Sequence, residues 1–358
     1  MERSSLNNAK RIVVKLGTAV LTDEQKRPDA AQMGQLVRQV AGLRQGGKEI
    51  VIVTSGAVGA GMGLLGFEKR PESVAEQQAC AAVGQSRLMA TYEKLFSEYD
   101  LQIAQVLLTH ADLQHEERHR NARNTLTTLL HRGIIPVINE NDAVSTTELK
   151  FGDNDKLSAL VAALLPAELL IILTSVDGLM ENFGETNARR VAIVPEIDSR
   201  VEDLAGGTTS TTAIGGMKSK IQAAKIVVRT GIPLVIAAGR DPTVLDRIVR
   251  GADVGTLFLP KPARLRGRKR WIAFFHHPRG SVFVDAGAKR ALKDNGKSLL
   301  APGVTRCDGE FEAGDIVSIC DEEGIEFARG MSGYSSSEIC TRRTAGHEIV
   351  HRDDLVIL

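Results

Sequence analysis

Aromatic residues are scarce in this chain. Only 4% of its 358 residues are Phe, Trp or Tyr, although 43% are hydrophobic, and Ala, Val, Leu and Gly dominate instead. Small aliphatic side chains suit close-packed layers of helix and sheet better than an aromatic-rich β-protein. The length leaves room for two domains, since a domain averages about 150 residues.

Other features are also missing, and each absence argues against a class of protein. The four cysteines include no C-x-x-C pair, which disfavours a disulfide framework or a cysteine zinc site and indicates a reducing compartment. Residues 1–11 are polar, unlike a signal peptide. The longest apolar stretch, residues 157–176, is interrupted by Pro166 and Glu168, so a helix followed by a buried strand explains it better than a membrane span. We therefore expect a cytoplasmic protein.

Charge is nearly balanced, and only one segment concentrates it. The net charge is +1, so no overall field favours nucleic acid or a membrane. Residues 260–270 are rich in Pro and Arg, and we interpret them as a basic linker. The sequence thus predicts one domain over residues 1–259 and a second over residues 271–358.

Short apolar runs alternate with helical patterns over residues 10–258. The runs are continuous, as in parallel strands that helices cover on both faces. We expect strands at residues 11–15, 49–54, 101–108, 133–138, 169–174 and 233–237. This pattern predicts an α/β domain with an open, mostly parallel sheet, whose ligands bind at the carboxyl ends of the strands.

The pattern changes to short strands in the second domain. We expect them at residues 271–275, 281–284, 315–320 and 326–331, separated by turn residues such as those at 278–280 and 308–309. Such spacing is typical of a small β-barrel or sandwich.

Three short motifs match known binding motifs but lack the surrounding sequence that would indicate a zinc, dinucleotide or phosphate site. Residues 115–119 read H-E-x-x-H, yet their neighbours are polar and no third ligand follows, so we expect no zinc site. Gly61, Gly63 and Gly66 match the dinucleotide fingerprint but come too late after the strand, and we expect them to allow close helix packing. The Gly-Lys-Ser at residues 296–298 lacks the first glycine of a Walker loop, because Ala291 stands in its place.

Two strand ends carry residues suited to anions. Lys15 ends the first strand and is followed by Leu-Gly-Thr, which would put an ammonium beside a phosphate-sized cavity; an ordinary surface lysine is the alternative. Residues 54–57, Thr-Ser-Gly-Ala, lead from the second strand into a helix. The free N–H groups of that helix could bind an anionic substrate, or Ser55 could simply cap it.

Polar residues crowd the junctions after the fourth strand. Asn-Glu-Asn-Asp occupies residues 139–142, and Phe-Gly-Asp-Asn-Asp occupies residues 151–155, before a helix that we expect to open at Leu157. These groups would repel one another unless a metal ion, a substrate ammonium or a lysine supplied positive charge. An Asx-rich turn that caps helices is the alternative.

A glycine-containing loop is expected at residues 214–220, before a helix at residues 221–228. Its glycines would let the backbone approach phosphates, and Lys220 could reach a transferring phosphoryl group. A flexible loop without a ligand is the alternative.

In this succession, the five segments resemble the motifs of the amino acid kinase family. Residues 81–87, 255–258 and 351–354 extend the resemblance over essentially the whole chain. The C-terminal domain resembles a PUA domain, which most members of the family lack. Within the family the match is best to kinases of the glutamate side chain. The resemblance therefore implies transfer of the γ-phosphate of ATP to the γ-carboxylate of glutamate, giving glutamyl 5-phosphate for proline biosynthesis.

The resemblance also implies roles for individual residues. Lys15 and Lys220 would flank the transferring phosphoryl group, and Asp155 would orient them. The glutamate-binding positions are Ser55, Asp142 and Asn154. The ATP-binding positions are Lys15, Thr174, Ser175, Ile214, Gly215, Gly216, Met217, Lys218, Ser219 and Lys220. Mg²⁺ would bridge the ATP phosphates, with no protein ligand assigned. Ser175 and Ile214 depart from the Asp and Thr that are frequent in the family.

Partners follow from the same resemblance. It implies feedback inhibition by proline and assembly into a dimer or tetramer. RNA binding through the PUA-like domain is the alternative function. Residues 271–358 contain ten Lys or Arg and fourteen Asp or Glu, a net charge of −4, so only the basic linker could supply contacts to RNA phosphates.

Overall fold

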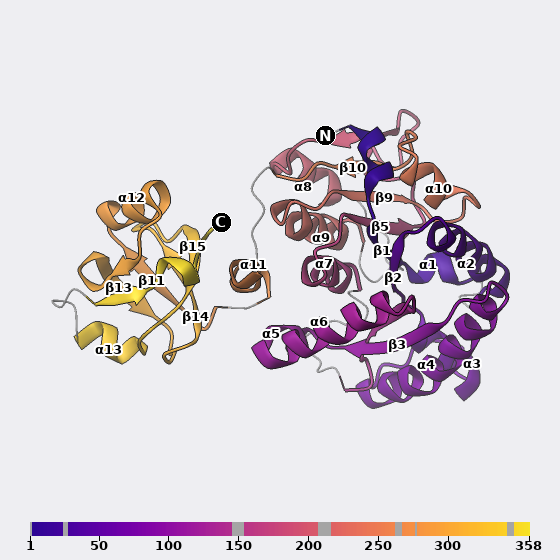
Figure 1. Cartoon of the computed structure of the whole chain (residues 1–358), viewed down its shortest axis with the longest axis horizontal. Coiled ribbons are helices and arrows are strands. Elements are labelled where there is room, and N and C mark those ends of the chain that lie inside the picture. The colour runs from indigo at the N-terminus through magenta and orange to yellow at the C-terminus, as the bar shows by residue number, and fades with distance from the viewer. Residues whose placement is uncertain are drawn as a thin grey trace. The chain divides into compact units, whose positions relative to one another are not determined.

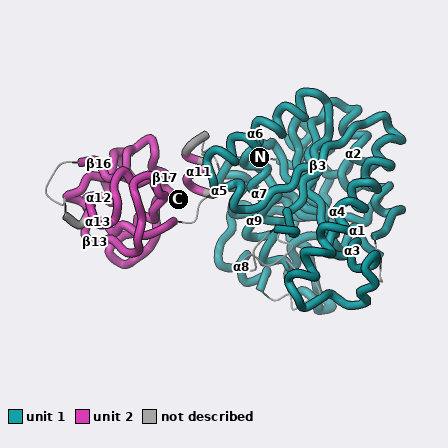
Figure 2. Tube along the Cα trace, turned by 90° about the horizontal axis from the view of Figure 1, so that it is seen from below, with its two compact units in different colours: residues 1–264 teal, residues 265–358 magenta. Residues whose placement is uncertain are grey.

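The computed structural model of the chain describes residues 2–23, 28–144, 154–206, 216–261, 267–275, 278–341 and 347–358. It divides into two compact units, residues 1–264 and residues 265–358 (Figure 2). Each unit has a hydrophobic core of its own. Across the described ranges, no helix is both long enough and apolar enough to cross a bilayer.

Unit 1 is built on an eight-stranded sheet with the order β3-β4-β2-β1-β5-β9-β10-β8. The strands are β1 Arg11–Leu16, β2 Glu49–Val53, β3 Ile103–Leu108, β4 Ile135–Glu140, β5 Leu169–Thr174, β8 Ile193–Val194, β9 Leu234–Ala238 and β10 Thr256–Phe258. Every pairing is parallel except that of β9 with β10. The mostly parallel sheet is confirmed, and the six predicted strands are present to within two residues.

Helices cover both faces of this sheet. They are α1 Thr18–Leu21, α2 Ala30–Gln45, α3 Ala57–Leu65, α4 Val74–Ser97, α5 His110–Gln114, α6 Glu116–His131, α7 Asn154–Leu164, α8 Ser199–Gly206, α9 Met217–Arg229 and α10 Val244–Val249. Figure 1 shows α7, α8 and α9 on one side of the strands and α1, α2 and α10 on the other. The 3₁₀ helix η1 Arg3–Asn8 and the two-stranded ribbon of β6 Met180–Glu181 and β7 Arg189–Arg190 complete the unit.

Strand alternation decides where the end of β1 points. Ile12, Val14 and Leu16 lie in the core that α2, α4 and α10 share with the sheet. Successive side chains of a strand point to opposite faces, so Lys15 lies on the other face, against which α7 packs. The alternation of side chains along β1 thus directs Lys15 toward α7, although both faces of the strand are buried.

Glycine permits a close approach of α3 to α4. A Cβ at Gly61 would lie 1.9 Å from the Cys80 carbonyl oxygen, and one at Gly84 would lie 1.8 Å from that of Ala57. Close packing is therefore confirmed for Gly61, whereas a Cβ at Gly63 would meet nothing within 4 Å. The turn into α3 uses Gly56, whose φ of +99° suits glycine.

The H-E-x-x-H residues do not form one helix. His115 ends α5 and precedes α6, whereas His119 lies within α6 with its Nδ1 atom 3.2 Å from the carbonyl oxygen of Leu113. His115 is the N-cap of α6 and has an extended backbone, so the two imidazoles do not both lie within a helix, as they do in the zinc motif.

Unit 2 contains a five-stranded sheet, β13-β11-β14-β15-β17, and a pair of short strands, β12 and β16. Its elements are α11 Gly267–Phe274, β11 Gly280–Val284, α12 Ala286–Asn295, β12 Leu299–Leu300, η2 Ala301–Gly303, β13 Val304–Asp308, β14 Ile316–Cys320, β15 Glu326–Met331, α13 Ser336–Thr341, β16 Glu348–Val350, η3 Arg352–Asp354 and β17 Leu355–Ile357. Three of its predicted strands are confirmed as β11, β14 and β15.

The strand predicted at residues 271–275 is wrong. These residues lie in α11 and just beyond it, and Trp271, Ile272 and Phe275 are buried. A short apolar run does not distinguish a buried strand from a buried helix, and this helix also takes in the end of the predicted basic linker.

Candidate active site

Three charged side chains meet at the carboxyl edge of the parallel sheet. Lys15 comes from the end of β1, Asp155 from the first turn of α7 and Lys220 from the first turn of α9, and all three are buried. The Lys15 Nζ atom lies 2.6 Å from Asp155 Oδ1, and the Lys220 Nζ atom lies 3.0 Å from Asp155 Oδ2. One carboxylate therefore holds two ammonium groups side by side.

The charge of Asp155 is secured by these neighbours. Burial alone would raise the pKa of its carboxyl, but the charges of Lys15 and Lys220 and a hydrogen bond from Ser219 outweigh burial and lower the pKa to about 2. Ser219 Oγ donates that bond at 2.6 Å. An anion of such low pKa is a poor general base at neutral pH, and its two contacts hold the lysine ammonium groups in place.

The segment that carries Lys220 is helical, which corrects part of the predicted loop. Helix α9 begins at Met217, so Met217, Lys218, Ser219 and Lys220 form its first turn, and Gly216 caps it. Met, Lys and Ser have higher helix propensity than glycine, which agrees with a helix that begins just after Gly216. Ile214 and Gly215 lie outside the described residues.

The N-terminus of α9 adds favourable potential beside the lysines. The first N–H groups of a helix have no partner within it, and the helix dipole places partial positive charge there. Together with two ammonium groups held by a single carboxylate, this end of α9 can stabilise a phosphoryl group on which negative charge builds up.

A chain of amide side chains joins the ends of β2 and β4 to α7. Asn154 Nδ2 donates to Ser55 Oγ and to Asn139 Oδ1, in both cases at 3.1 Å. Asn154 Oδ1 accepts from the backbone N–H of Glu140 at 3.3 Å. Gln85 of α4 anchors the chain, because its Oε1 atom accepts from Asn139 Nδ2 at 2.8 Å. Two predicted glutamate-binding residues, Ser55 and Asn154, are thus in direct contact.

Asp142, the third of these predicted residues, lies in a less favourable setting for an anion. Burial, and then the neighbouring charge of Glu140, raise the pKa of Asp142 to about 6, and Arg70 only partly opposes them. Its Oδ1 atom is buried and has no hydrogen-bond partner among the described residues. A cation placed here would relieve both the repulsion and the missing contact.

Thr174, the last residue of β5, and Ser175 after it are predicted nucleotide residues that lie beside the end of β1. Strands β1 and β5 pair in parallel, with Leu16 opposite Leu173, and the N–H of Gly17 donates to the Leu173 carbonyl at 3.1 Å. Thr174 therefore follows at the same edge of the sheet as Lys15, and Ser175 is exposed. Their part in ATP binding stays a prediction.

Sequence reasoning assigned no role to several residues of this site. Gln85, Asn139 and Glu140 were noted only as parts of motifs, and His110 and Arg70 were not noted at all. The position of Asn139 and Glu140 at the end of β4 was the available indication, since side chains at that edge face the ligand.

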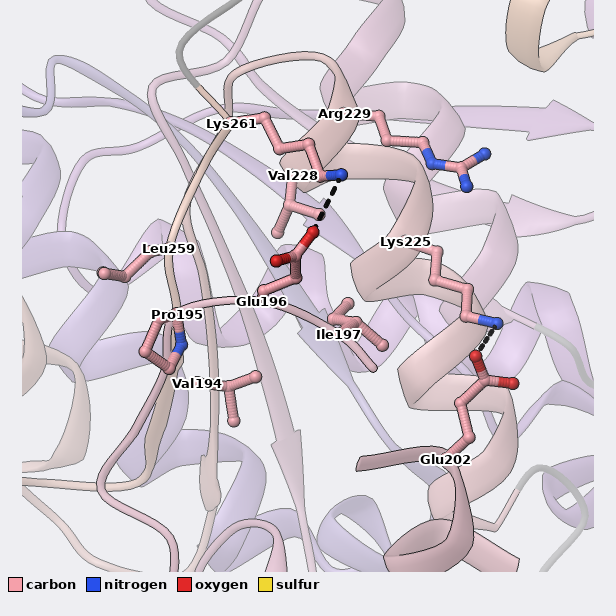
Figure 3. A pocket seen from close by; sticks show the side chains of 10 residues that line it. All are labelled: Val194, Pro195, Glu196, Ile197, Glu202, Lys225, Val228, Arg229, Leu259 and Lys261. Atoms are coloured by element: carbon pink, nitrogen blue, oxygen red, sulfur yellow. Dashed lines mark hydrogen bonds and ion pairs between the residues drawn. The ribbon is translucent and has the colours of Figure 1, made fainter. Parts of the chain in front are cut away.

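A separate hollow lies at the other end of α9. Its volume is about 100 Å³, and two ion pairs line it, Lys225 with Glu202 at 2.7 Å and Lys261 with Glu196 at 3.3 Å (Figure 3). None of the predicted catalytic residues lines it. The residues predicted to be catalytic lie instead at the N-terminal end of α9 and beside it.

Comparison with known proteins agrees with this geometry. The model of the amino acid kinase family matches residues 10–238. The chain belongs to the amino acid kinase family. The model of the PUA domain matches residues 280–351, within unit 2.

Full-length relatives place the chain more narrowly within that family. It is 46% identical to the glutamate 5-kinase of Moorella thermoacetica, over 99% of this chain and 98% of that one. It is 47% identical to the glutamate 5-kinase of Citrifermentans bemidjiense, over the whole of both chains. A solved carbamate kinase from Giardia lamblia, bound to AMP-PNP, shares the fold with a TM-score of 0.52 at 16% identity, over 71% of this chain and all of its own.

Proposed function

We propose that the chain transfers the γ-phosphate of ATP to the γ-carboxylate of L-glutamate, forming glutamyl 5-phosphate and ADP. This reaction would open proline biosynthesis. The observation that carries the proposal is Asp155 between two buried lysines at the sheet edge. The full-length relatives support glutamate as the acceptor, since they bear the name glutamate 5-kinase.

The chemistry needs charge stabilisation more than proton transfer. The γ-carboxylate of glutamate is already ionised at neutral pH, so it attacks the γ-phosphorus directly and ADP leaves. Lys15 and Lys220 would lie on either side of the transferring group and offset its negative charge. Asp155 keeps both ammonium groups in place before the reaction, which avoids reorganisation during it.

The acceptor would lie on Ser55, Asn154 and Asp142. The hydroxyl and the amide can hold a carboxylate of glutamate, and the carboxylate of Asp142 suits its α-ammonium. ATP would bind along the end of β5 and the N-terminus of α9, with Lys15, Thr174 and Ser175 and the turn at Gly216.

We expect Mg²⁺ to arrive with ATP, held by the phosphates. Both oxygens of Asp155 are engaged by lysines. In the parts of the chain that the structure describes, no three His, Cys, Asp or Glu side chains form a group that could hold a metal ion. The described side chains therefore would not hold Mg²⁺ without the ATP phosphates. The charge stabilisation proposed above depends on Lys15 and Lys220.

A panel of acceptors tests the proposal. ADP release is measured with glutamate, N-acetylglutamate, carbamate, aspartate and UMP, each with ATP and Mg²⁺. Glutamate should give the highest kcat/KM by a wide margin. Activity only with another member of the panel would overturn the assignment.

Regulation and assembly are further parts of the proposal. We expect proline to inhibit by competing with glutamate, and the chain to form a dimer or tetramer in the cytoplasm. The kinetic panel repeated with proline tests the inhibition, and light scattering of the purified protein tests the assembly.

RNA binding by unit 2 is the alternative function, and it would need the linker residues. A gel shift at low and high salt tests it, and the absence of a shift at low salt would exclude it.

A further inference from the structure

Unpartnered polar atoms gather on the acceptor side of the site. Gln85 Nε2, both ring nitrogens of His110, both carboxylate oxygens of Glu140 and Asp142 Oδ1 are buried without a hydrogen-bond partner among the described residues. All four residues are at least nine-tenths buried. A buried polar atom without a partner costs about 1–3 kcal/mol, so a cluster of them in a native protein calls for a ligand.

The backbone of Glu140 is held by hydrogen bonds, and its carboxylate lies beside His110. Its N–H is held by Asn139 Oδ1 at 3.0 Å and by Asn154 Oδ1 at 3.3 Å. His110 Nδ1 lies 3.3 Å from its Oε2 atom, without the alignment of a hydrogen bond. The same Asn154 that bonds Ser55 therefore also holds the backbone of Glu140 at the edge of the proposed acceptor site.

The cluster contains two carboxylates, and the positive charge of Arg70 only partly offsets the environment that raises the pKa of Asp142. Two carboxylates, Glu140 and Asp142, stand close enough for one to disturb the other, and His110 is the only basic side chain within the ion-pair distance of Glu140 among the described residues. Both carboxylates keep free oxygen atoms. A ligand that brings one positive charge and several N–H donors would satisfy them, and a primary ammonium does both.

We propose that Glu140, positioned by His110, binds the α-ammonium of the acceptor together with Asp142, and so restricts the site to acceptors with a free α-amino group. This inference rests on the proposed function and adds a specificity-determining residue to it. His110 acts through Glu140 and does not touch the substrate.

A purely structural ion pair explains the arrangement less well. A pair that served only to join α5 to β4 would be hydrogen-bonded, or replaceable by apolar packing. Here neither residue of the pair makes a hydrogen bond through its side chain among the described residues, and the charge of Glu140 acts on a second carboxylate, Asp142, which has one buried oxygen without a partner.

Glutamate and glutarate test the inference, because they differ only in the α-ammonium. The KM for glutamate and the inhibition constant of glutarate are measured for the wild type, for Glu140→Gln and for Glu117→Gln, an exposed residue of α6. Glu140→Gln should raise the KM for glutamate at least tenfold, with kcat and the KM for ATP within threefold. The inhibition constant of glutarate should stay the same or fall. Glu117→Gln should change nothing.

Variants of His110 separate positioning from folding. His110→Ala should raise the KM for glutamate at least fivefold, whereas His110→Asn, which keeps a donor near Nδ1, should recover most of the loss. If Glu140→Gln lowers only the melting temperature and leaves unchanged the ratio of the KM for glutamate to the inhibition constant of glutarate, the inference is wrong. A wild type that releases no ADP with glutamate would instead refute the proposed function.

Discussion

The two halves of the candidate site differ in how far their polar groups are satisfied. In the phosphoryl half, Asp155 receives contacts from Lys15, Lys220 and Ser219. In the acceptor half, Glu140 and Asp142 leave buried oxygens without hydrogen bonds among the described residues. The lysines of the first half are held around Asp155 before any ligand binds, although Asp155 Oδ1 contacts Lys15 as an ion pair without a hydrogen bond among the described residues, and we expect the acceptor to complete the second half.

This difference follows from what each half must do. Charge develops on the phosphoryl group only during the reaction, so the groups that stabilise it act best when they are fixed beforehand. A zwitterionic acceptor carries its charges throughout, and a site with unsatisfied carboxylates gains most when the acceptor arrives. Damage to the first half should therefore lower kcat, and damage to the second should raise KM.

The largest effect is expected for Asp155→Asn. Without the carboxylate, the two buried ammonium groups repel each other and leave their positions, so kcat should fall on the order of a thousandfold. Loss of one partner from a buried ion pair also destabilises by about 3–5 kcal/mol, which thermal unfolding measures. Asp241→Asn, at a partly exposed carboxylate paired with Arg247, is the control and should be active. If kcat of Asp155→Asn stays within tenfold of the wild type, Asp155 does not hold the two lysines in place for the reaction.

Lys220→Ala should have the next largest effect. It removes one of the two charges on the transferring group, and kcat should fall about a hundredfold while the KM for glutamate changes little. Lys225→Ala is a matched control on the same helix, since Lys225 pairs with Glu202 near the surface. If kcat is unchanged in Lys220→Ala, this lysine does not act on the transition state.

Much of the phosphoryl half could be predicted from the sequence. Lys15 stands at the end of an apolar run, and Lys220 follows a glycine-containing segment before a predicted helix. The family resemblance joined them to Asp155, which precedes another predicted helix. The sequence did not show that Ser219 also bonds Asp155. That bond needs the first turn of α9, and the prediction placed these residues in a loop.

The pH dependence of glutamate binding probes the acceptor half. The pKa of Asp142 is raised to about 6, so in the free protein this residue is largely protonated at pH 5 and ionised at pH 7. The KM for glutamate should therefore fall about tenfold as the pH rises from 5 to 7. Asp142→Asn should have a high KM that no longer changes over this range. A pH-independent KM in the wild type would mean that Asp142 does not bind the ammonium.

The same residue has the opposite effect on stability. A carboxyl whose pKa is higher in the folded state than its usual value of 3.8 binds more protons when folded, so its contribution to stability falls as the pH rises from about 4 to 6. Above pH 7, Asp142→Asn should stabilise the free protein by up to about 3 kcal/mol, as calorimetry or chemical unfolding would show. Added glutamate should reduce this difference in unfolding free energy between Asp142→Asn and the wild type.

The acceptor half was the harder half to predict. Its contacts join residues far apart in the chain, such as Gln85 with Asn139 and His110 with Glu140, and no local pattern encodes such pairs. The fold predicts only that strand ends meet at one edge. Which buried atoms remain without partners there depends on side-chain geometry.

The strand wrongly predicted at residues 271–275 has a similar origin, since tertiary packing decided between helix and strand.

The smallest effect is expected behind the acceptor half, at Tyr92. Its hydroxyl lies 2.8 Å from Thr54 Oγ1, in the residue before Ser55, and both residues are buried. Tyr92→Phe removes one neutral hydrogen bond, worth about 1 kcal/mol, and should raise the KM for glutamate less than threefold. Tyr99→Phe, at a partly buried residue just after the same helix, is the control. A KM increase in Tyr92→Phe as large as that in Asp142→Asn would mean that packing, and not the ligand, completes this half of the site.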